Sequence, residues 1–431
     1  MTTDKNKTIW LFNQYAITPE QAGGSRHFSI ARLLVEKGYD ITIFAAGFNY
    51  QERKETKCTG RELFKIEMID GVRFVWIKTA AYTKNNWKRI VNMLSYSYRV
   101  CHLYKKLTES NKLPKPGIVI GSAVHLFAVF SGYRIARHFR VPFIMEVRDL
   151  WPMTIVEFKK SYRFHPGVMF FGWLDRFLAR RADHLVSVLP YAYDFYKRYG
   201  LTEQQVTWIP NGVDTSAYPQ MAQLPSTATP EKPFTVRYTG TFGNEACLHT
   251  LLGAAKIIQD KNIRVQFEIT GSGEKKSELL ELCKTLSLSN MTFHPPVIKD
   301  AIPGLLTSAD ALWIGSKNVK NLYKYGFSFN KLFEYLASGK PVLFSIDSRY
   351  NPVEESKAGL TIPPENGEAL ADAIIKLVEM TPEQRMEMGN RGIEHVRKCY
   401  TFEILAGKFD ELLSNVENWG EKKTGNKQRE I

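Results

Sequence analysis

The sequence predicts an α/β protein with two domains, each built around a parallel sheet. Its 431 residues exceed what one ordinary hydrophobic core accommodates, and two domains of about 200 residues each are the usual solution. Strand-like and helix-like segments alternate through both halves, which is typical of βαβ units. Between the halves, residues 215–233 are rich in Pro, Ser and Thr and nearly uncharged, as a linker or surface loop would be.

The first βαβ unit is the clearest. Residues 8–12 have the pattern of a buried strand, and a helical spacing of apolar residues begins at Ser25. Gly38 ends that helix, and residues 40–44 start the next strand. Further strands of the first half are expected at 72–77, 117–121, 142–146 and 185–189.

The second half repeats this layout. Strands are expected at 235–240, 265–271, 310–315 and 341–346. Helices are expected between and after them at 247–259, 275–287, 300–308, 329–338, 368–379, 382–398 and 402–416. Ligands of doubly wound sheets bind outside the carboxyl ends of the strands, so the loops that follow these strands are the places to look for a site.

Composition indicates a folded, soluble chain, with 44% hydrophobic and 24% charged residues. There is no apolar run long enough to span a bilayer, and the first residues lack the layout of a signal peptide. The five cysteines are far apart and form no CxxC pair, which argues against a zinc site or a disulfide framework. We therefore expect a cytoplasmic location.

The positive charge is concentrated in the first half. Residues 1–214 contain 32 Lys/Arg and 18 Asp/Glu, a difference of +14, whereas the remaining residues contain 26 of each. A basic half attracts polyanions such as nucleic acid, an anionic bilayer surface or a phosphorylated acceptor. Ordinary solubilising charge is the alternative.

The strongest local motif is GFSFNKLFEYLASGKPVLFS, residues 326–345. A helix is expected to begin near Phe329, which places Asn330 and Lys331 in its first turn, where free backbone N–H groups favour an anion such as a diphosphate. Glu334, one turn later, could accept hydrogen bonds from ribose hydroxyls. The alternative is that Asn330 and Lys331 merely start a helix and that Glu334 is a solvated position.

This segment resembles the donor-binding helix of the family 4 glycosyltransferases, retaining enzymes of the GT-B fold. Glu334 matches the second glutamate of that family's motif, while the first would fall at Gly326. A subgroup of this family in O-antigen, lipopolysaccharide and capsule pathways has an NKLFEY-like helix without the first glutamate. This sequence resembles that subgroup. The resemblance implies that Glu334 binds the ribose, and it leaves recognition of the sugar open.

The loop 238–252 also lacks charged residues that are typical of the family. Thr241 and Ala246 stand where most members have an Arg and a Lys that bind the diphosphate. Gly240 and Gly243 could let backbone N–H groups approach phosphate instead, with Lys331 as the replacement cation and Lys324 as a weaker candidate. The resemblance also places the loop containing Gly271 and Gly273 beside the nucleotide base, although a lone GxG is by default a tight turn.

In the first half, Gly23 and Gly24 form the loop after the first strand and resemble a Gly-Gly loop of the family, where donor phosphate or acceptor approaches. A flexible turn is the alternative. Arg26 follows in the first helical turn and could meet a phosphate of either substrate, so we assign it to acceptor binding.

Two more strand ends carry candidate residues. His125 follows the strand at 117–121, at about the place of a family histidine that contacts the transferred sugar. Glu146, Arg148 and Asp149 follow the strand at 142–146. We predict catalytic roles for His125, Arg148 and Asp149 and an acceptor-binding role for Glu146, with a structural ion pair as the alternative for the charged residues.

Residues 82–107 mix aromatic, aliphatic and basic side chains at roughly helical spacing. Trp87, Ile90, Met93 and Leu94 could share one face, with basic residues around it, as in helices that lie on anionic membranes. The alternative is a core helix with a solvated basic side.

Taken along nearly the whole chain, the resemblance implies two Rossmann-like domains facing across a cleft: an acceptor domain at 1–208, completed by a helix at about 402–418 that crosses back to it, and a nucleotide-sugar domain at 209–400. We expect residues 419–431 to be a flexible tail. The expected activity is transfer of a hexosyl or N-acetylhexosaminyl group, with retention and without a metal or other cofactor. The expected donor is a nucleotide sugar, UDP-linked by preference, and the expected acceptor a lipid-linked saccharide or polysaccharide at the inner face of the cytoplasmic membrane.

Other functions stay open. A GT-B epimerase or phosphorylase would share the fold, and a non-catalytic, membrane-associated partner protein would explain the replacements at Gly326, Thr241 and Ala246. We expect no nucleic-acid partner, because the basic half contains no recognised motif.

Overall fold

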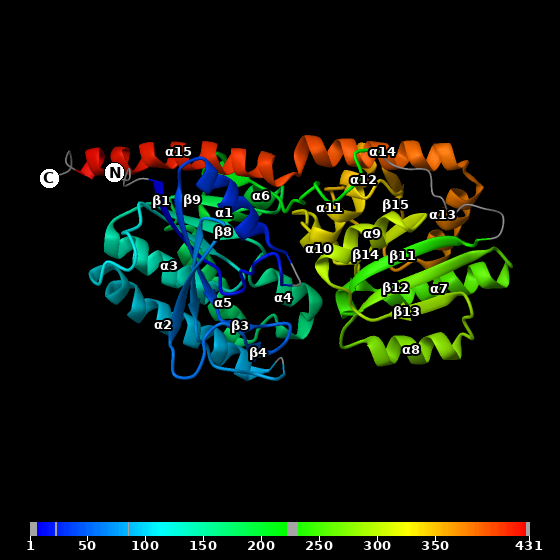
Figure 1. The fold of residues 1–431 in the computed structure, drawn as a ribbon, viewed down its shortest axis with the longest axis horizontal. Helices are drawn as coiled ribbons and strands as arrows, with labels where there is room; N and C mark the ends of the chain where they lie inside the picture. The colour runs from blue at the N-terminus through cyan, green and yellow to red at the C-terminus, as the bar shows by residue number, and fades with distance from the viewer. Residues whose placement is uncertain (1–6, 22–23, 85, 222–231, 428–431) are drawn as a thin grey trace. The chain divides into compact units, whose positions relative to one another are not determined.

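The computed structural model describes residues 7–21, 24–84, 86–221 and 232–427, and it divides into two compact units. The first unit comprises residues 1–210 together with 402–431, and the second comprises 211–401 (Figure 1). The division falls between Pro210 and Asn211, close to the boundary expected at 208/209.

The first unit is built on an eight-stranded sheet in the order β10-β9-β8-β7-β1-β2-β6-β5. All neighbours pair in parallel except β5 and β6. The strands are β1 (Thr8–Phe12), β2 (Asp40–Ala46), β5 (Phe64–Ile69), β6 (Val72–Ile77), β7 (Ile118–Ser122), β8 (Phe143–Val147), β9 (His184–Ser187) and β10 (Val206–Trp208), with a small separate hairpin of β3 (Phe48–Asn49) and β4 (Lys54–Glu55). The central strands are apolar and buried on both faces, as parallel strands between helix layers must be.

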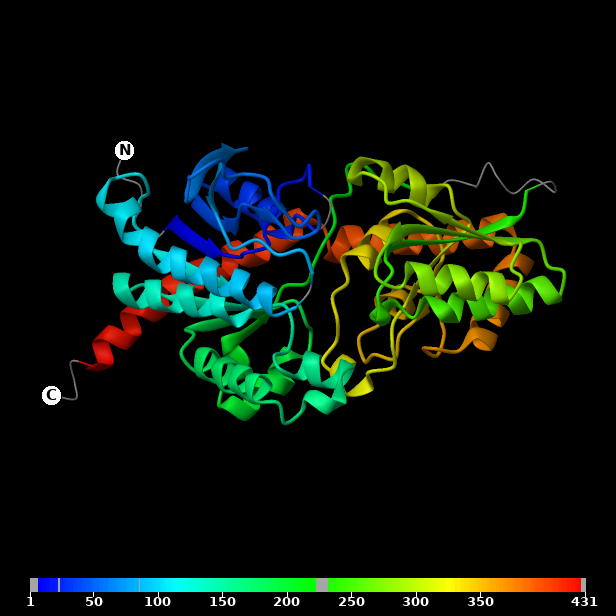
Figure 2. The same cartoon turned by 90° about the horizontal axis from the view of Figure 1, so that it is seen from below.

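Side chains cap the starts of three helices of this unit. Asn86, His125 and His165 accept hydrogen bonds from backbone N–H groups in the first turns of α2, α3 and α5. Helices α2 and α3 pack side by side (Figure 2). The helices are α1 (Arg26–Glu36), α2 (Trp87–Glu109), α3 (Leu126–Phe139), α4 (Met153–Phe158), α5 (Pro166–Ala179), α6 (Ala192–Tyr196) and the C-terminal α15 (Phe402–Lys427).

Helix α15 completes the first unit. It packs against α1, and its Leu405 and Leu413 are buried in the core of that unit (Figure 1). Asp410 accepts hydrogen bonds from Lys37 and from the Tyr39 hydroxyl, both at 2.9 Å. The return of the C-terminal helix to the first domain is therefore confirmed, and the helix continues to Lys427, beyond the end expected at residue 416.

The second unit contains a six-stranded sheet, entirely parallel, in the order β13-β12-β11-β14-β15-β16. Its strands are β11 (Phe234–Thr241), β12 (Val265–Ser272), β13 (Met291–His294), β14 (Ala311–Gly315), β15 (Val342–Ser345) and β16 (Gly359–Thr361). Its helices are α7 (Leu248–Asp260), α8 (Lys276–Thr285), α9 (Ile302–Thr307), α10 (Lys320–Tyr323), α11 (Asn330–Ala337), α12 (Pro352–Ser356), α13 (Gly367–Glu379) and α14 (Pro382–Cys399). The predicted α/β class with parallel sheets is confirmed in both units.

Two features differ from the sequence-based expectations. Strands β5, β10, β13 and β16 were not predicted; most of their residues are only partly buried, so their apolar patterns are weak. On α2, Met93 is buried toward the core, whereas Trp87, Ile90 and Leu94 are exposed, so the expected four-residue apolar face is divided between core and surface. No helix in the described part of the chain combines the length and hydropathy that a membrane span requires.

Replacing Leu413 by Ala should destabilise the first unit by about 2–5 kcal/mol, because it leaves a cavity in the core that α15 completes. Urea unfolding followed by tryptophan fluorescence measures the loss. The neighbouring Glu411→Ala, at an exposed position of the same helix, should change stability by less than about 0.5 kcal/mol. Equal effects of the two substitutions would show that α15 does not contribute to that core.

Candidate active site

Helix α11 begins at the carboxyl edge of the second sheet without a side-chain cap. Phe329 occupies the cap position and makes no side-chain hydrogen bond to the helix, and the first turn contains no acidic residue. The loop before the helix is fixed by Asn211, whose backbone N–H donates to the Ser328 hydroxyl (2.8 Å) and whose side-chain amide donates to the Ser328 carbonyl (2.5 Å). This end of the helix, with Asn330 and Lys331 in its first turn, can therefore offer backbone N–H groups to an anion.

Lys331 is held against the end of β11. Its ammonium donates to the Tyr238 hydroxyl at 2.9 Å and lies 4.3 Å from the centre of the Tyr238 ring. The Tyr238 hydroxyl in turn donates to the carbonyl of Thr241 at 2.8 Å. Burial lowers the pKa of Lys331, an effect that the nearby Tyr335 and Glu334 oppose. The result is a positioned cation beside the uncapped helix end.

Two glycines make room for this arrangement. Gly240 and Gly271 face each other across β11 and β12, with φ of 146° and 147°. A Cβ atom at Gly240 would lie 2.5 Å from the Lys331 ammonium, and one at Gly271 would lie 1.9 Å from the Gly240 carbonyl oxygen. The two glycines are thus required for packing, and contact of their N–H groups with phosphate stays a prediction.

The other two predicted glycines of this edge lie in the adjoining loops. A Cβ atom at Gly273 would lie 2.6 Å from the Phe242 backbone nitrogen, so that glycine permits the two strand-end loops to touch. Gly243 precedes a short 3-10 helix at Asn244–Ala246. Gly240, Gly243, Gly271, Gly273 and Lys331 are therefore gathered by the fold at one edge of the second sheet.

Glu334 is half-buried and makes no hydrogen bond or ion pair through its carboxylate with any described residue. Burial raises its pKa, and the charges of Lys299 and Lys331 lower it. A carboxylate in this setting can accept hydrogen bonds from ligand hydroxyls without first losing an internal partner. Gly326, where the family motif has its first glutamate, has a φ of 88°, a conformation that disfavours a glutamate.

In the first unit, His125 is the N-terminal cap residue of α3. Its Nδ1 accepts a hydrogen bond from the Ala128 N–H (3.2 Å), and its Nε2 donates to the Gln14 side-chain oxygen (2.7 Å). The Gln14 amide nitrogen in turn donates to Asn92 Oδ1 (2.5 Å). Burial lowers the pKa of His125 to about 3, and the charge of Arg89 adds to this effect. Both ring nitrogens are engaged in the interior, which fits a residue that positions the β7–α3 loop better than one that transfers a proton.

Arg26 and Glu146 form a buried ion pair. Arg26 Nε lies 3.3 Å from Glu146 Oε1, its guanidinium also donates to the carbonyls of Ile209 and Pro210, and His27 lies 2.5 Å from Glu146 Oε2. The side chains of Arg26 and Glu146 are 2% and 0% exposed. Neither side chain presents a surface to a ligand in this structure, which favours the alternative of a structural ion pair, and the acceptor-binding role of these two residues stays a prediction.

The remaining candidates of the first unit lie near the carboxyl end of β8. Asp149 is exposed and Arg148 is half-buried. The indole of Trp151 donates to the Ala123 carbonyl (3.2 Å), which joins this loop to the one after β7. Catalytic roles for Asp149 and Arg148 stay predictions. Gly24 is exposed in the β1–α1 loop, and Gly23 lies outside the described residues.

Sequence reasoning missed Tyr238, Gln14 and Asn92, which hold Lys331 and His125 in place. The available signal was position: Tyr238 precedes Gly240 in a predicted strand, and Gln14 lies two residues after the end of another. Polar or aromatic residues at such strand ends are candidates for supporting a site.

Family comparison agrees with this geometry. Residues 23–217 match Glycosyltransferase Family 4, and residues 220–395 match Glycosyl transferases group 1. The chain belongs to the GT4-like glycosyltransferases of the GT-B fold. A comparison with the curated proteins finds no match in sequence.

Solved structures with a similar fold include three proteins of low sequence identity to this chain. Sucrose-phosphate synthase of Thermosynechococcus elongatus is 16% identical, with a TM-score of 0.72 over 95% of this chain and 99% of that chain. α,α-Trehalose 6-phosphate synthase of Burkholderia multivorans is 12% identical, with a TM-score of 0.68 over 97% and 98%. Anabaena HepE is 13% identical, with a TM-score of 0.63 over 95% and 99%. At these identities the likeness shows the fold.

The buried His125 should make the first unit sensitive to acid. Its pKa falls from 6.5 in the unfolded chain to about 3 in the folded one, so the unfolded chain takes up the proton first and stability is lost as pH falls below 6.5. At pH 5 this one residue costs about 2 kcal/mol relative to neutral pH.

Urea unfolding of the wild type and of His125→Gln at pH 7 and pH 5 measures this loss. The variant should lose about 2 kcal/mol less than the wild type between the two pH values, whatever its stability at pH 7. Equal losses in the two proteins would contradict the neutral, buried state of His125.

Proposed function

We propose that this glycosyltransferase moves a sugar from a nucleotide-sugar donor, UDP-linked by preference, to a lipid-linked saccharide or polysaccharide, with retention of configuration. The observation that carries the proposal is the group formed by Lys331, Glu334 and the uncapped start of α11. It combines a cation, free N–H groups and an unpaired carboxylate within one helical turn. That is the set of partners that a nucleoside diphosphate needs.

In this proposal the diphosphate binds between the start of α11 and the Lys331 ammonium, while Glu334 accepts hydrogen bonds from the ribose. Anabaena HepE, which shares the fold, has been solved with UDP-glucose and with UDP, and this supports a UDP-linked donor here. The transferred group is a hexosyl or N-acetylhexosaminyl unit.

The chemical demand is stabilisation of the departing diphosphate. Donors that are already oriented toward developing negative charge are effective because they need no rearrangement during the reaction. Lys331, fixed by Tyr238, and the N–H groups of α11 fulfil this role without a metal in the transfer step. The acceptor hydroxyl attacks from the face that the diphosphate leaves, which retains the configuration.

Replacing Lys331 by Met should weaken binding of UDP-glucose about 10- to 100-fold, because a charge-assisted contact contributes about 1.5–3 kcal/mol. Isothermal titration calorimetry measures the affinity, after a thermal-shift screen with UDP-, GDP- and ADP-sugars has identified the preferred donor. Lys324→Met is the matched control: this lysine is exposed in the same unit, and its loss should change the affinity less than about twofold.

A donor affinity that depends on Lys324 and not on Lys331 would contradict the assigned cation. Absence of selective binding to any nucleotide sugar, in folded protein with lipid present, would favour the non-catalytic partner protein over the enzyme.

The surface of the first unit supports a membrane-bound acceptor. On α2, Trp87 (66% exposed), Ile90, Leu94 and Tyr98 present apolar and aromatic side chains to solvent. A second such group lies on and just before α5, with Phe164, Met169, Phe170 and Trp173 exposed. The same segments also contain exposed basic residues: Lys84, Lys88, Lys105, Lys106, Lys159, Lys160, Arg163, Arg176, Arg180 and Arg181.

Helices α2 and α5 both pack against α3, so the two groups belong to one helical layer of the first unit. A helical layer with exposed apolar and basic side chains is suited to the interface of an anionic bilayer, where each nearby Lys or Arg contributes about 1 kcal/mol. We therefore propose that the protein is peripheral on the inner face of the cytoplasmic membrane, within surface-polysaccharide synthesis.

The triple replacement Trp87→Ser, Ile90→Ser, Leu94→Ser should reduce co-sedimentation with phosphatidylglycerol vesicles at least about tenfold, because it removes several kcal/mol of apolar burial. Ile298→Ser, at a residue that is exposed on the second unit, should leave it unchanged. Binding should also weaken with salt. Undiminished sedimentation of the triple variant would exclude α2 as the membrane contact.

A further inference from the structure

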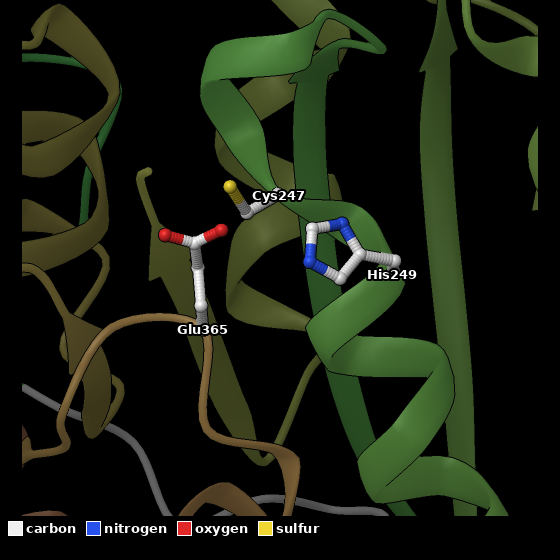
Figure 3. A group of neighbouring side chains, drawn as sticks. All are labelled: Cys247, His249 and Glu365. Carbon is white, nitrogen blue, oxygen red and sulfur yellow. The ribbon is translucent and has the colours of Figure 1, made fainter. Parts of the chain in front are cut away.

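Three side chains of the second unit that are typical metal ligands converge from two separate segments. Cys247 and His249 stand at the start of α7, and Glu365 stands in the loop between β16 and α13 (Figure 3). Their thiol sulfur, imidazole nitrogen and carboxylate oxygen all lie within 4.8 Å of one another. They border a cavity of about 170 Å³ that Gly243 and Lys317 also line.

The spacing is close to what one ion requires. Zn²⁺ is bound at about 2.3 Å by sulfur and at about 2.0–2.2 Å by nitrogen or oxygen, so two ligands of a tetrahedral ion lie about 3.5 Å apart. His249 is exposed and can rotate toward Cys247, which is buried, and Glu365 is exposed as well. Thiolate, imidazole and carboxylate together form a donor set that favours zinc over magnesium or calcium.

The backbone holds two of the three residues in place. Cys247 and Glu365 both adopt left-handed conformations, with φ of 48° and 56°, which non-glycine residues seldom do. The Asn318 N–H donates to Glu365 Oε2 at 2.8 Å, which orients the carboxylate at the border of the cavity. A contact of this kind to a carboxylate is typical of the supporting shell around a metal.

The charges around the cluster are compatible with an ion. Cys247 is the cap residue of α7, and Glu365 precedes Asn366, the cap residue of α13. Helix N-termini repel a cation but stabilise anionic ligands, and a thiolate with a carboxylate neutralises the two charges of Zn²⁺.

We propose that Cys247, His249 and Glu365 bind one Zn²⁺ ion, with water as the fourth ligand. Zinc replaces the thiol proton, which passes to the solvent, so that one proton leaves for each ion bound to Cys247. The ion joins the loop after β11 to the loop after β16 and thereby fastens the N-terminal ends of α7 and α13. It takes no part in the sugar transfer, and the proposal does not depend on the identity of the donor.

Titration of the full-length, metal-free protein with Zn²⁺ against a chromophoric chelator tests the site. The wild type should bind one ion per chain with a rise in melting temperature, and Co²⁺ should give a thiolate charge-transfer band in the near ultraviolet. His249→Ala and Glu365→Gln should each weaken Zn²⁺ binding at least about tenfold. Cys247→Ser should abolish the cobalt band.

Matched controls separate this site from adventitious binding. Cys283→Ser and His294→Ala replace a cysteine and a partly exposed histidine of the same unit and should bind Zn²⁺ as the wild type does. Because His249 and Glu365 are exposed, their variants should fold even if Cys247→Ser does not. Binding that is absent in the wild type, or unchanged in His249→Ala and Glu365→Gln, would overturn the proposal.

Discussion

The close approach of β11 and β12 at their carboxyl ends is the constraint on which the candidate donor site depends. Glycine is favoured at positions 240 and 271 because φ is 146° and 147°, and a Cβ atom at 271 would also collide with the Gly240 carbonyl, while one at 240 would displace the Lys331 ammonium. The space left by the missing side chains admits Lys331, which Tyr238 then fixes. A lysine on a helix would otherwise sample many rotamers, so this packing converts a mobile charge into a preorganised one. Where the resembled family has an Arg and a Lys, this chain has Thr241 and Ala246, and the cation comes instead from α11.

Much of the fold was predictable because its signals are local. Buried parallel strands such as β1, β2 and β6 are nearly continuous apolar runs, and the helices between them follow a regular apolar spacing. Short strands at or near the sheet edges, such as β13 and β16, lack that signal because neighbouring strands and solvent, not their own residues, define them. The return of α15 was predictable only through the family resemblance, since its partners in α1 lie hundreds of residues away in the chain.

The site was predictable where residue types and their position on an element both indicate the same function. It was not predictable where the function depends on whether a side chain faces the core or the solvent. For α11, the residue types and the helix start together indicated an anion site, and the fold places them beside the strand-end glycines. At β8, a charged residue after a strand could point to solvent or to the core. Glu146 is buried, where the charge of Arg26 pairs with it and His27 is hydrogen-bonded to it, whereas Asp149 is exposed. A single sequence contains no signal that distinguishes these two directions.

The cysteine pattern shows another limit of prediction from sequence, because here the sequence argued against a site. The absence of a CxxC pair argued against zinc, because local ligand pairs are the usual sequence signature of a structural site. That argument assumes that ligands are close in sequence, but the packing of α7 on α13 brings Glu365 next to Cys247 across more than a hundred residues. A three-ligand group with water as its fourth ligand has no fixed spacing, and only the fold reveals it. An ion here would strengthen the contact between the two helices whose first turns border the Gly243 loop. The stability of that loop would then depend on the zinc ion and its three ligands, which are separate from the residues proposed to bind the donor.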